Sequence, residues 1–165
     1  MGTLIVVDGD KVEGTDNHNV TGTGVPSTTP PPTVPIKATA DFDYKGSMTD
    51  ELSEFVSING SVIALVTSKS SLDPGEDAIG GHAAISAKNI AEVVPTVTTG
   101  SELIIKIVDP IGIGIPSAGV GSSFVKIDGD SVLLDGDKID TCDGKSATEN
   151  STVTAEEQDF VSCSE

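Results

Sequence analysis

The apolar and polar positions of this chain repeat one pattern three times. A short apolar run is followed by an Asp-Gly or Asn-Gly pair and then by a second apolar run, within residues 5–12, 55–65 and 124–134. Asp-Gly and Asn-Gly favour the tight type I′ turn because glycine adopts positive φ without steric cost, so each stretch predicts a β-hairpin. Three such hairpins in one chain predict a fold built around an approximate threefold axis.

The segments after the first hairpin are predicted to lie outside regular strands. Residues 14–19 are polar and indicate a loop that carries His18. Residues 21–35 are rich in Pro, Gly and Thr and lack the backbone donors of a sheet interior, so they predict an exposed, polyproline-like loop insertion. A single helical turn is expected over residues 48–54, capped by a serine or a threonine.

Three later segments complete the predicted order. Residues 102–108 are mostly apolar and predict a largely buried strand. Residues 111–121 alternate glycine with bulky apolar side chains, a pattern that suits either a narrow place where backbones approach closely or a flexible loop. The acidic C-terminal segment, residues 145–165, is expected to return to the body of the protein.

The composition indicates one small, mainly all-β domain over residues 1–165. Only 3% of the residues are aromatic and none is Trp, while the chain contains 18 Gly and 9 Pro. The core must therefore be assembled from Val, Ile, Leu and Ala in short strands with many turns. A chain of this length supports one well-buried core rather than two.

The charge excludes two classes of partner. The chain has 26 acidic residues, 9 lysines and no arginine, and its formal net charge is -17 at pH 7. Binding to nucleic acid or to an anionic membrane surface needs clustered cations, so neither is expected. The most apolar segment, residues 103–115, is interrupted by Lys106 and Asp109 and falls short of the roughly 20 residues of a bilayer span, so no stable membrane insertion is expected. No basic region precedes the first apolar run, so no secretory signal is expected.

The third hairpin and the residues after it resemble the PAAR-repeat family. Within residues 123–142 an apolar strand, a Gly turn, a second strand, a Gly-Asp pair and a cysteine follow one another in that family's order. The second copy, residues 56–71 with Gly81-His82 beyond it, is similar to the divergent PAAR-like branch. Residues 14–18 match the loop that carries the first metal ligand. The tetrapeptide Pro-Ala-Ala-Arg is missing, and the chain has two histidines where the family uses three.

Members of this family cap the spikes of type VI secretion systems, phage contractile tails and related injection particles. The resemblance implies a small conical PAAR-like domain of three pseudo-threefold β-hairpin repeats with long loops. Its base is expected to dock on a homotrimeric VgrG-like or phage central spike protein, one chain per trimer, so that the tip sharpens the spike and helps it pierce the target envelope. The implied location is the tip of a phage tail or of a secreted injection particle, after synthesis in the bacterial cytoplasm without a signal peptide.

The apolar hairpin faces supply the expected contacts with the spike, namely Val56, Ile58, Val125 and Ile127. Packing in the protein's own core is an equally available role for these four side chains. The alternative function is a virion decoration protein or adhesin-like β-domain that binds a receptor through the Pro-rich segment. Copy number separates the two functions, because a cap binds once per trimer whereas a decoration protein covers a surface in many copies.

The family uses histidines and a cysteine to bind one structural zinc ion near the apex. The corresponding candidates here are His18, His82, Cys142 and Cys163, which together form the His₂Cys₂ set that tetrahedral Zn²⁺ accepts. A disulfide between Cys142 and Cys163 is an alternative, as are four residues with no shared site. Cys163 lies outside the hairpins, and an aspartate or a water is able to take its place as a ligand.

No enzyme is expected from the motifs of this chain. It has no nucleophile elbow, no phosphate-binding glycine loop and no metalloprotease helix motif. The two histidines are the only side chains that ordinarily titrate near neutral pH, and ligation of zinc is their better use. A small metal-dependent hydrolase remains as a further alternative, and it requires an open coordination position on the metal.

Overall fold

The computed structural model describes residues 2–24, 34–73, 88–96, 104–108, 113–141 and 149–163, and within these ranges the chain is all-β, as the composition predicts. None of the described residues forms a helix, so none belongs to a helix that is long and apolar enough to cross a membrane. Two of the predicted zinc ligands, His82 and Cys142, lie outside the described residues.

The described residues form fourteen strands, and every pairing between them is antiparallel. In chain order they are β1 (Thr3–Leu4), β2 (Lys11–Gly24), β3 (Val34–Asp50), β4 (Ser57–Ile58), β5 (Ser61–Val62), β6 (Lys69–Leu72), β7 (Lys88–Val94), β8 (Ile104–Ile107), β9 (Gly114–Pro116), β10 (Lys126–Ile127), β11 (Asp130–Ser131), β12 (Lys138–Thr141), β13 (Ser151–Thr154) and β14 (Ser162–Cys163). Most are short, as a chain rich in Gly and Pro requires.

Six of these strands close a narrow barrel. The hydrogen-bonded order runs through β2, β3, β6, β9, β12 and β13 and returns to β2, so each of the six has a partner on both sides. Gly114 of β9 pairs with Ser70 of the adjacent strand β6, and a Cβ atom on Gly114 would meet the Ser70 Oγ at 2.3 Å. The side chains of Ser70, Ile139 and Thr141 on the neighbouring strands thus occupy the space beside Gly114, and a larger residue would not fit there.

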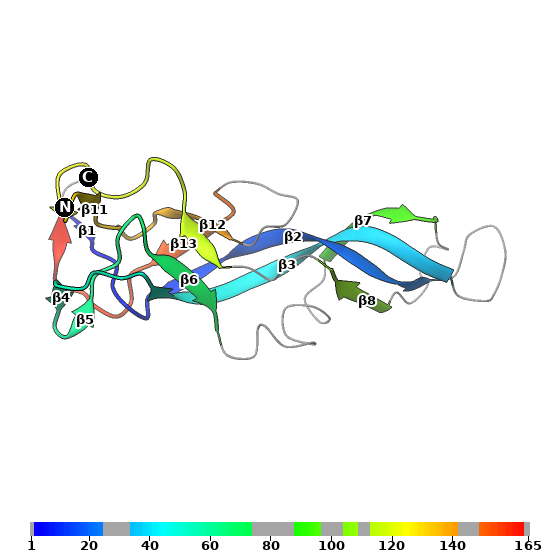
Figure 1. Ribbon diagram of the computed structural model, residues 1–165, viewed down its shortest axis with the longest axis horizontal. Coiled ribbons are helices and arrows are strands. Elements are labelled where there is room, and N and C mark those ends of the chain that lie inside the picture. Colours follow the sequence, from blue (N-terminus) through cyan, green and yellow to red (C-terminus); the bar gives the residue numbers. More distant parts are fainter. Residues whose placement is uncertain are drawn as a thin grey trace.

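β2 and β3 continue beyond the barrel as one long hairpin. Their register runs from the Lys11–Ser47 pair to the Gly24–Val34 pair without interruption. β7 pairs with the outer part of β3 and β8 with the outer part of β2, which widens the extension to four strands. Figure 1 shows this extension projecting away from the barrel. The molecule is therefore elongated, with the barrel toward one end and the long hairpin at the other.

Two predicted loops are wrong where the structure describes them. Residues 14–19 belong to β2, in which every second residue from Val12 to Val20 faces inward. Polar side chains at inward positions conceal this alternation in the sequence. Residues 21–24 and 34–35, predicted within the Pro-rich insertion, belong to β2 and β3, where residues 21–24 pair with residues 34–37 at the outer end of the hairpin. The rest of the insertion lies outside the described residues.

Two other predicted elements have different outcomes. The strand predicted over residues 102–108 is confirmed as β8, and its last residue, Ile107, is buried. The helical turn predicted over residues 48–54 is wrong, because Met48 to Asp50 complete β3. Ser53 follows in a loop, where its Oγ accepts hydrogen bonds from backbone amides rather than capping a helix.

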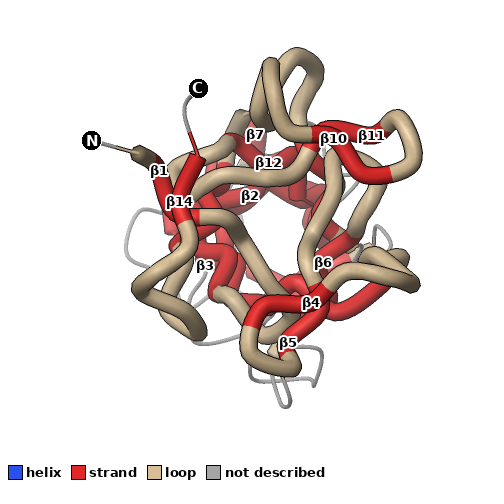
Figure 2. Tube along the Cα trace, turned by 90° about the vertical axis from the view of Figure 1, so that its left-hand side faces the viewer, coloured by secondary structure: helices blue, strands red, loops and turns tan. Residues whose placement is uncertain are grey.

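Three two-stranded ribbons, β1–β14, β4–β5 and β10–β11, occupy the end of the barrel opposite the long hairpin. Figure 2 views this end, hereafter the ribbon end, and shows the ribbons at the three corners of a triangle. Both chain termini lie beside the β1–β14 ribbon, where Thr3 pairs with Cys163. The C-terminal segment thus supplies one strand of the barrel, β13, and one strand of a ribbon, β14.

Buried side chains form three clusters along the long axis. The barrel cluster contains Val6, Val12, Tyr44, Met48, Ala64, Leu133, Ile139 and Val153. The ribbon cluster contains Ile5, Val7, Ile58, Ile63, Leu65, Val132 and Leu134. The hairpin cluster contains Val20, Ala38, Ala40, Phe42 and Ile107. Small aliphatic residues thus make up most of the core, as the composition predicts.

Candidate functional site

Three residues from distant parts of the chain close a ring of backbone hydrogen bonds. The amide of Val6 donates to the carbonyl of Leu133 at 3.0 Å, Leu133 donates to Ala64 at 3.0 Å, and Ala64 donates back to Val6 at 2.9 Å. All three residues are fully buried. A ring in which each member donates to one neighbour and accepts from the other requires three equivalent chain segments around one axis. The approximate threefold axis predicted by the hairpins is therefore present in the fold.

A second ring of three hydrogen bonds repeats this relationship. In it, the Asp8 amide donates to the Val62 carbonyl at 2.7 Å, the Val66 amide to Ser131 at 3.0 Å, and the Asp135 amide to Leu4 at 2.9 Å. Isolated bridges follow the same rotation, joining Ile5 to Leu134, Val7 to Ile63 and Leu65 to Val132. The equivalent repeats are residues 156–163 together with 2–12, residues 51–70, and residues 120–139; we call them the first, second and third repeat.

In the structure, the first repeat aligns with the other two differently from the alignment that the sequence predicts. Asn59 and Gly60 both have positive φ, 52° and 95°, as a type I′ turn requires, whereas in the Asp8-Gly9 pair only Gly9 does, at 89°. Gly9 matches Gly136, also at 89°, rather than Gly60. The hairpin predicted over residues 5–12 is therefore wrong, because this segment pairs with the other two repeats and does not fold back on itself.

The first repeat is assembled from both ends of the chain. Thr3 and Leu4 pair with Cys163 and Ser162, just as Ser61 and Val62 pair with Ile58 and Ser57 in the second repeat. Cys163 therefore occupies the position of Ile58, and it packs against the ribbon cluster as Ile127 of the third repeat does. The ribbon end is complete only when the two ends of the chain meet.

A buried polar side chain shapes the same loop in each repeat. Ser53 accepts hydrogen bonds from the amides of Phe55 and Val56, Ser122 from those of Phe124 and Val125, and Gln158 from those of Phe160 and Val161, over 2.8–3.4 Å. All three polar side chains are buried. Because satisfied buried polar groups confine the backbone to one geometry, the loop that follows each of them is ordered in the same way.

Each of these loops places a phenylalanine on the surface. Phe55 is 78% exposed, Phe124 74% and Phe160 61%. The chain has only four phenylalanines, and the fourth, Phe42, is fully buried in the hairpin cluster. Large aromatic side chains are usually buried, so three exposed ones at equivalent positions distinguish the ribbon end from the rest of the described surface.

Acidic side chains surround two of the three phenylalanines. A groove of about 310 Å³ lies between the second and third repeats, and its lining includes Leu52, Phe55, Leu65, Ile127, Glu51, Glu54, Asp128 and Asp130. Next to Phe160 the exposed acidic residues are Glu156, Glu157 and Asp159. Lys126 is the only lysine within residues 51–65, 120–134 and 156–163. A partner at this end therefore meets apolar rings bordered by negative charge.

The four residues predicted to contact a partner have a different main role. Ile58 is only 7% exposed and belongs to the ribbon cluster, and Val125 and Ile127 are partly buried against that cluster. Val56 is 38% exposed, which is the largest exposure among the four. The structure thus favours core packing for three of them, and it exposes the adjacent Phe55 and Phe124 instead.

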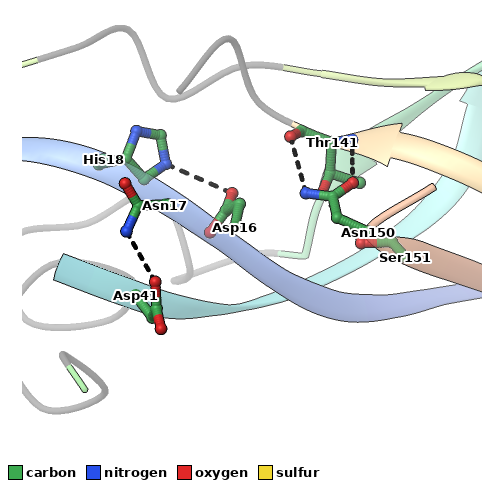
Figure 3. Close-up of polar contacts among 7 residues, drawn as sticks. All are labelled: Asp16, Asn17, His18, Asp41, Thr141, Asn150 and Ser151. Carbon is green, nitrogen blue, oxygen red and sulfur yellow. Dashed lines mark hydrogen bonds and ion pairs between the residues drawn. The ribbon is translucent and has the colours of Figure 1, made fainter. Parts of the chain in front are cut away.

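His18 lies inside the long hairpin, together with Asp16. Both side chains are fully buried, and the His18 Nε2 lies 3.3 Å from the Asp16 Oδ2 (Figure 3). The His18 ring also contacts Phe42 edge to face, with 5.7 Å between ring centroids. A buried carboxylate is costly unless it has a polar partner, and the imidazole supplies one. On the other side of β2, Asn17 donates to Asp41 at 2.7 Å.

The predicted set of zinc ligands does not meet in one place. His18 lies within the hairpin, whereas Cys163 pairs with Thr3 in a ribbon at the opposite end of the molecule (Figure 1). His18 and Cys163 therefore do not belong to one zinc site. Cys163 is a free cysteine, and Cys142 lies outside the described residues. In its repeat Cys163 holds the position of Ile58, where it packs, partly buried, against the ribbon cluster.

Zinc itself stays a prediction. The described residues contain no group of three or more His, Cys, Asp or Glu side chains able to hold a metal ion. Among them His18 and Asp16 supply two ligands at most, whereas structural zinc takes four. A zinc centre near His18 therefore depends on ligands outside the described residues, and His82 and Cys142 are the predicted ones.

No family model, curated protein or solved structure matches this chain. Its repeats do resemble one another. Phe55-Val56-Ser57-Ile58, Phe124-Val125-Lys126-Ile127 and Phe160-Val161-Ser162-Cys163 share a Phe-Val pair followed two positions later by an apolar residue. This signal was sufficient to locate the third exposed phenylalanine and the C-terminal part of the first repeat, both of which the hairpin pattern missed.

Proposed function

We propose that this protein is a structural tip that caps and sharpens the homotrimeric central spike of a contractile injection apparatus, with one chain on each trimer. The observation that carries the proposal is the ring of hydrogen bonds through Val6, Ala64 and Leu133, which places three equivalent segments of one chain around one axis. The resemblance of the hairpins to the PAAR-repeat family supports the same role.

Threefold repetition within one chain is useful when the partner has true threefold symmetry. The end of a homotrimer presents three identical surfaces, related by rotation about the trimer axis. A chain with one binding surface would engage one of them and leave two uncovered. A chain with three equivalent segments engages all three at once, and it also covers strand edges at the trimer's end that would otherwise lack partners.

The shape of the molecule supports a cap with two unlike ends. The three ribbons spread into a triangle at one end (Figure 2), whereas the β2–β3 hairpin projects from the other (Figure 1). In this proposal the triangular ribbon end faces the end of the trimer, and the hairpin points outward along the spike axis. In this role the chain acts mechanically at the tip of a phage tail or of a secreted injection particle.

Stoichiometry tests the proposal directly. The chain is co-expressed with a homotrimeric β-helical spike protein encoded in the same genome, and the complex is weighed by native mass spectrometry. The expected species contains three spike subunits and one copy of this chain. An unrelated homotrimeric β-helix of similar width serves as the control and should not bind. Failure to bind the spike, or binding in many copies to a capsid surface, would overturn the proposal in favour of a decoration protein.

A further inference from the structure

We infer that Phe55, Phe124 and Phe160 are the anchors by which the ribbon end binds its partner, and that the partner presents three equivalent apolar recesses bordered by cationic side chains. The inference rests on the proposed function and names the contacts that perform it. It replaces the four contact residues that the hairpin pattern predicts, because those side chains lie mostly in the core.

Phe55, Phe124 and Phe160 lie at equivalent positions in the three repeats. The three phenylalanines follow equivalent buried polar residues and precede equivalent ribbon strands, β4, β10 and β14. The approximate threefold axis that relates the repeats therefore relates the anchors as well. Val56, next to Phe55, is the other exposed large apolar residue of the described ribbon end, whereas the remaining ones lie beside the long hairpin or near β9: Val94, Val108, Ile113 and Ile115.

The backbone at each of the three phenylalanines is already ordered. Each phenylalanine is held by a hydrogen bond from its own amide to the buried polar side chain two positions earlier, at 3.4 Å for Phe55 and 3.2 Å for Phe124 and Phe160. An anchor whose backbone is already ordered loses less conformational entropy on binding, so more of its contact energy appears as affinity. Aromatic side chains in such positions are typical of the few residues that dominate an interface.

Charge defines the chemistry of the partner. The exposed acidic residues beside Phe55 and Phe160 are Glu54, Glu156, Glu157 and Asp159, and Asp128 and Asp130 line the groove that contains Phe55. Glu51 in the same groove is paired with Lys69. An acidic partner surface would be repelled from this end, whereas lysines and arginines around each recess are attracted to it. Since a homotrimer repeats any recess three times, identical cationic borders face all three anchors.

The test measures binding of three single variants, Phe55→Ser, Phe124→Ser and Phe160→Ser, and of the triple variant to the purified spike trimer. Each single variant should weaken Kd by about ten- to one-hundredfold, and the triple variant should show no binding. Ile115→Ser is the matched control, since it removes an exposed apolar side chain outside the ribbon end and should bind normally. Melting temperatures should remain close to that of the unsubstituted chain, because all four side chains are exposed.

Ionic strength tests the charged border separately. Binding of the unsubstituted chain should weaken as salt is added, and the variant Glu54→Gln/Asp159→Asn should bind more weakly at low salt with a shallower salt dependence. A triple phenylalanine variant that still binds one per trimer would overturn the anchors and leave the proposed function intact. An unsubstituted chain that does not bind the trimer would overturn the proposed function and the anchors together. Salt-independent binding would overturn the cationic border.

Discussion

Thr3 and Cys163 are antiparallel partners, so the two ends of the chain build one ribbon. The same positions in the second repeat, Ser61 and Ile58, are joined by the type I′ turn at Asn59-Gly60. A circular permutant in which Cys163 is joined to Thr3 through Asn-Gly, and the chain is opened between Asn59 and Gly60, should therefore fold. We expect a melting temperature close to that of the original chain, measured by circular dichroism.

The site of the opening is the control for this permutant. A second permutant with the same Asn-Gly junction, opened between Val132 and Leu133, interrupts the buried hydrogen-bonded ring of the third repeat. It should be unfolded or strongly destabilised. Equal stability of the two permutants would show that the ring contributes nothing to the fold.

Substitution of Leu133 should destabilise the protein. Leu133 is fully buried at the centre of the barrel cluster, so Leu133→Ala removes buried apolar surface and leaves a cavity. The free energy of unfolding, measured by urea denaturation, should fall by about 2–5 kcal/mol. Ile115→Ala is the control, because Ile115 is 47% exposed, and its change should stay within about 0.5 kcal/mol. Similar losses for the two variants would contradict the assignment of Leu133 to the core.

The ion pair between Lys11 and Asp73 should make stability depend on pH in the acid range. Lys11 Nζ lies 3.0 Å from Asp73 Oδ2, and Ser47 Oγ donates to Asp73 Oδ1 at 2.7 Å. Partial burial raises the pKa of the Asp73 carboxyl, but the hydrogen bonds from Ser47 and Lys11 and the charge of Lys11 outweigh it and lower that pKa below its usual value.

A carboxyl with a lowered pKa in the folded state stabilises the protein above its unfolded pKa, and this contribution is lost as pH falls through the folded pKa. The variant Asp73→Asn should therefore lose up to about 1 kcal/mol of unfolding free energy at neutral pH, since the pair is partly exposed. The difference from the original chain should vanish in strong acid. A difference that persists or grows below the folded pKa would contradict this role of Asp73.

Zinc content separates the predicted ligands. Metal analysis of the purified protein should return about one zinc ion per chain, and chelation should lower the melting temperature. His18→Ala, His82→Ala and Cys142→Ser should each reduce the zinc content. Cys163→Ser should retain it, because Cys163 lies at the ribbon end. A metal-free chain whose melting temperature is unaffected by chelator would exclude the zinc centre.

Local sequence patterns predicted the parts of the fold that depend on neighbouring residues. The Asn59-Gly60 and Asp128-Gly129 turns follow from the tolerance of these residues for positive φ, and their ribbons follow from the flanking apolar runs. β2 was missed around His18, because Asp16 and His18 occupy inward positions that are normally apolar. Their side chains contact each other, and the His18 ring contacts Phe42; short-range patterns do not contain these contacts.

The candidate site was predicted only in part for a related reason. Val56 and Ile58 are two positions apart, which in an extended segment places them on one face and Phe55 on the other, and this pattern does not show which face the other repeats cover. The exposure of Phe55 and Phe124 results from how three repeats pack around the axis. Phe160 lies in a copy of the repeat whose other half is at the opposite end of the sequence.

By itself, the sequence determined the β class and the two hairpins that turn at Asn59-Gly60 and Asp128-Gly129, because these depend on the φ preferences and apolar spacing of adjacent residues. Only the tertiary structure decided that Asp8-Gly9 corresponds to Asp135-Gly136, that both chain ends complete one repeat, and that Cys163 packs, partly buried, against the ribbon cluster. Those features depend on hydrogen bonds between segments far apart along the chain, and such bonds are selected by the simultaneous packing of all three repeats around one axis.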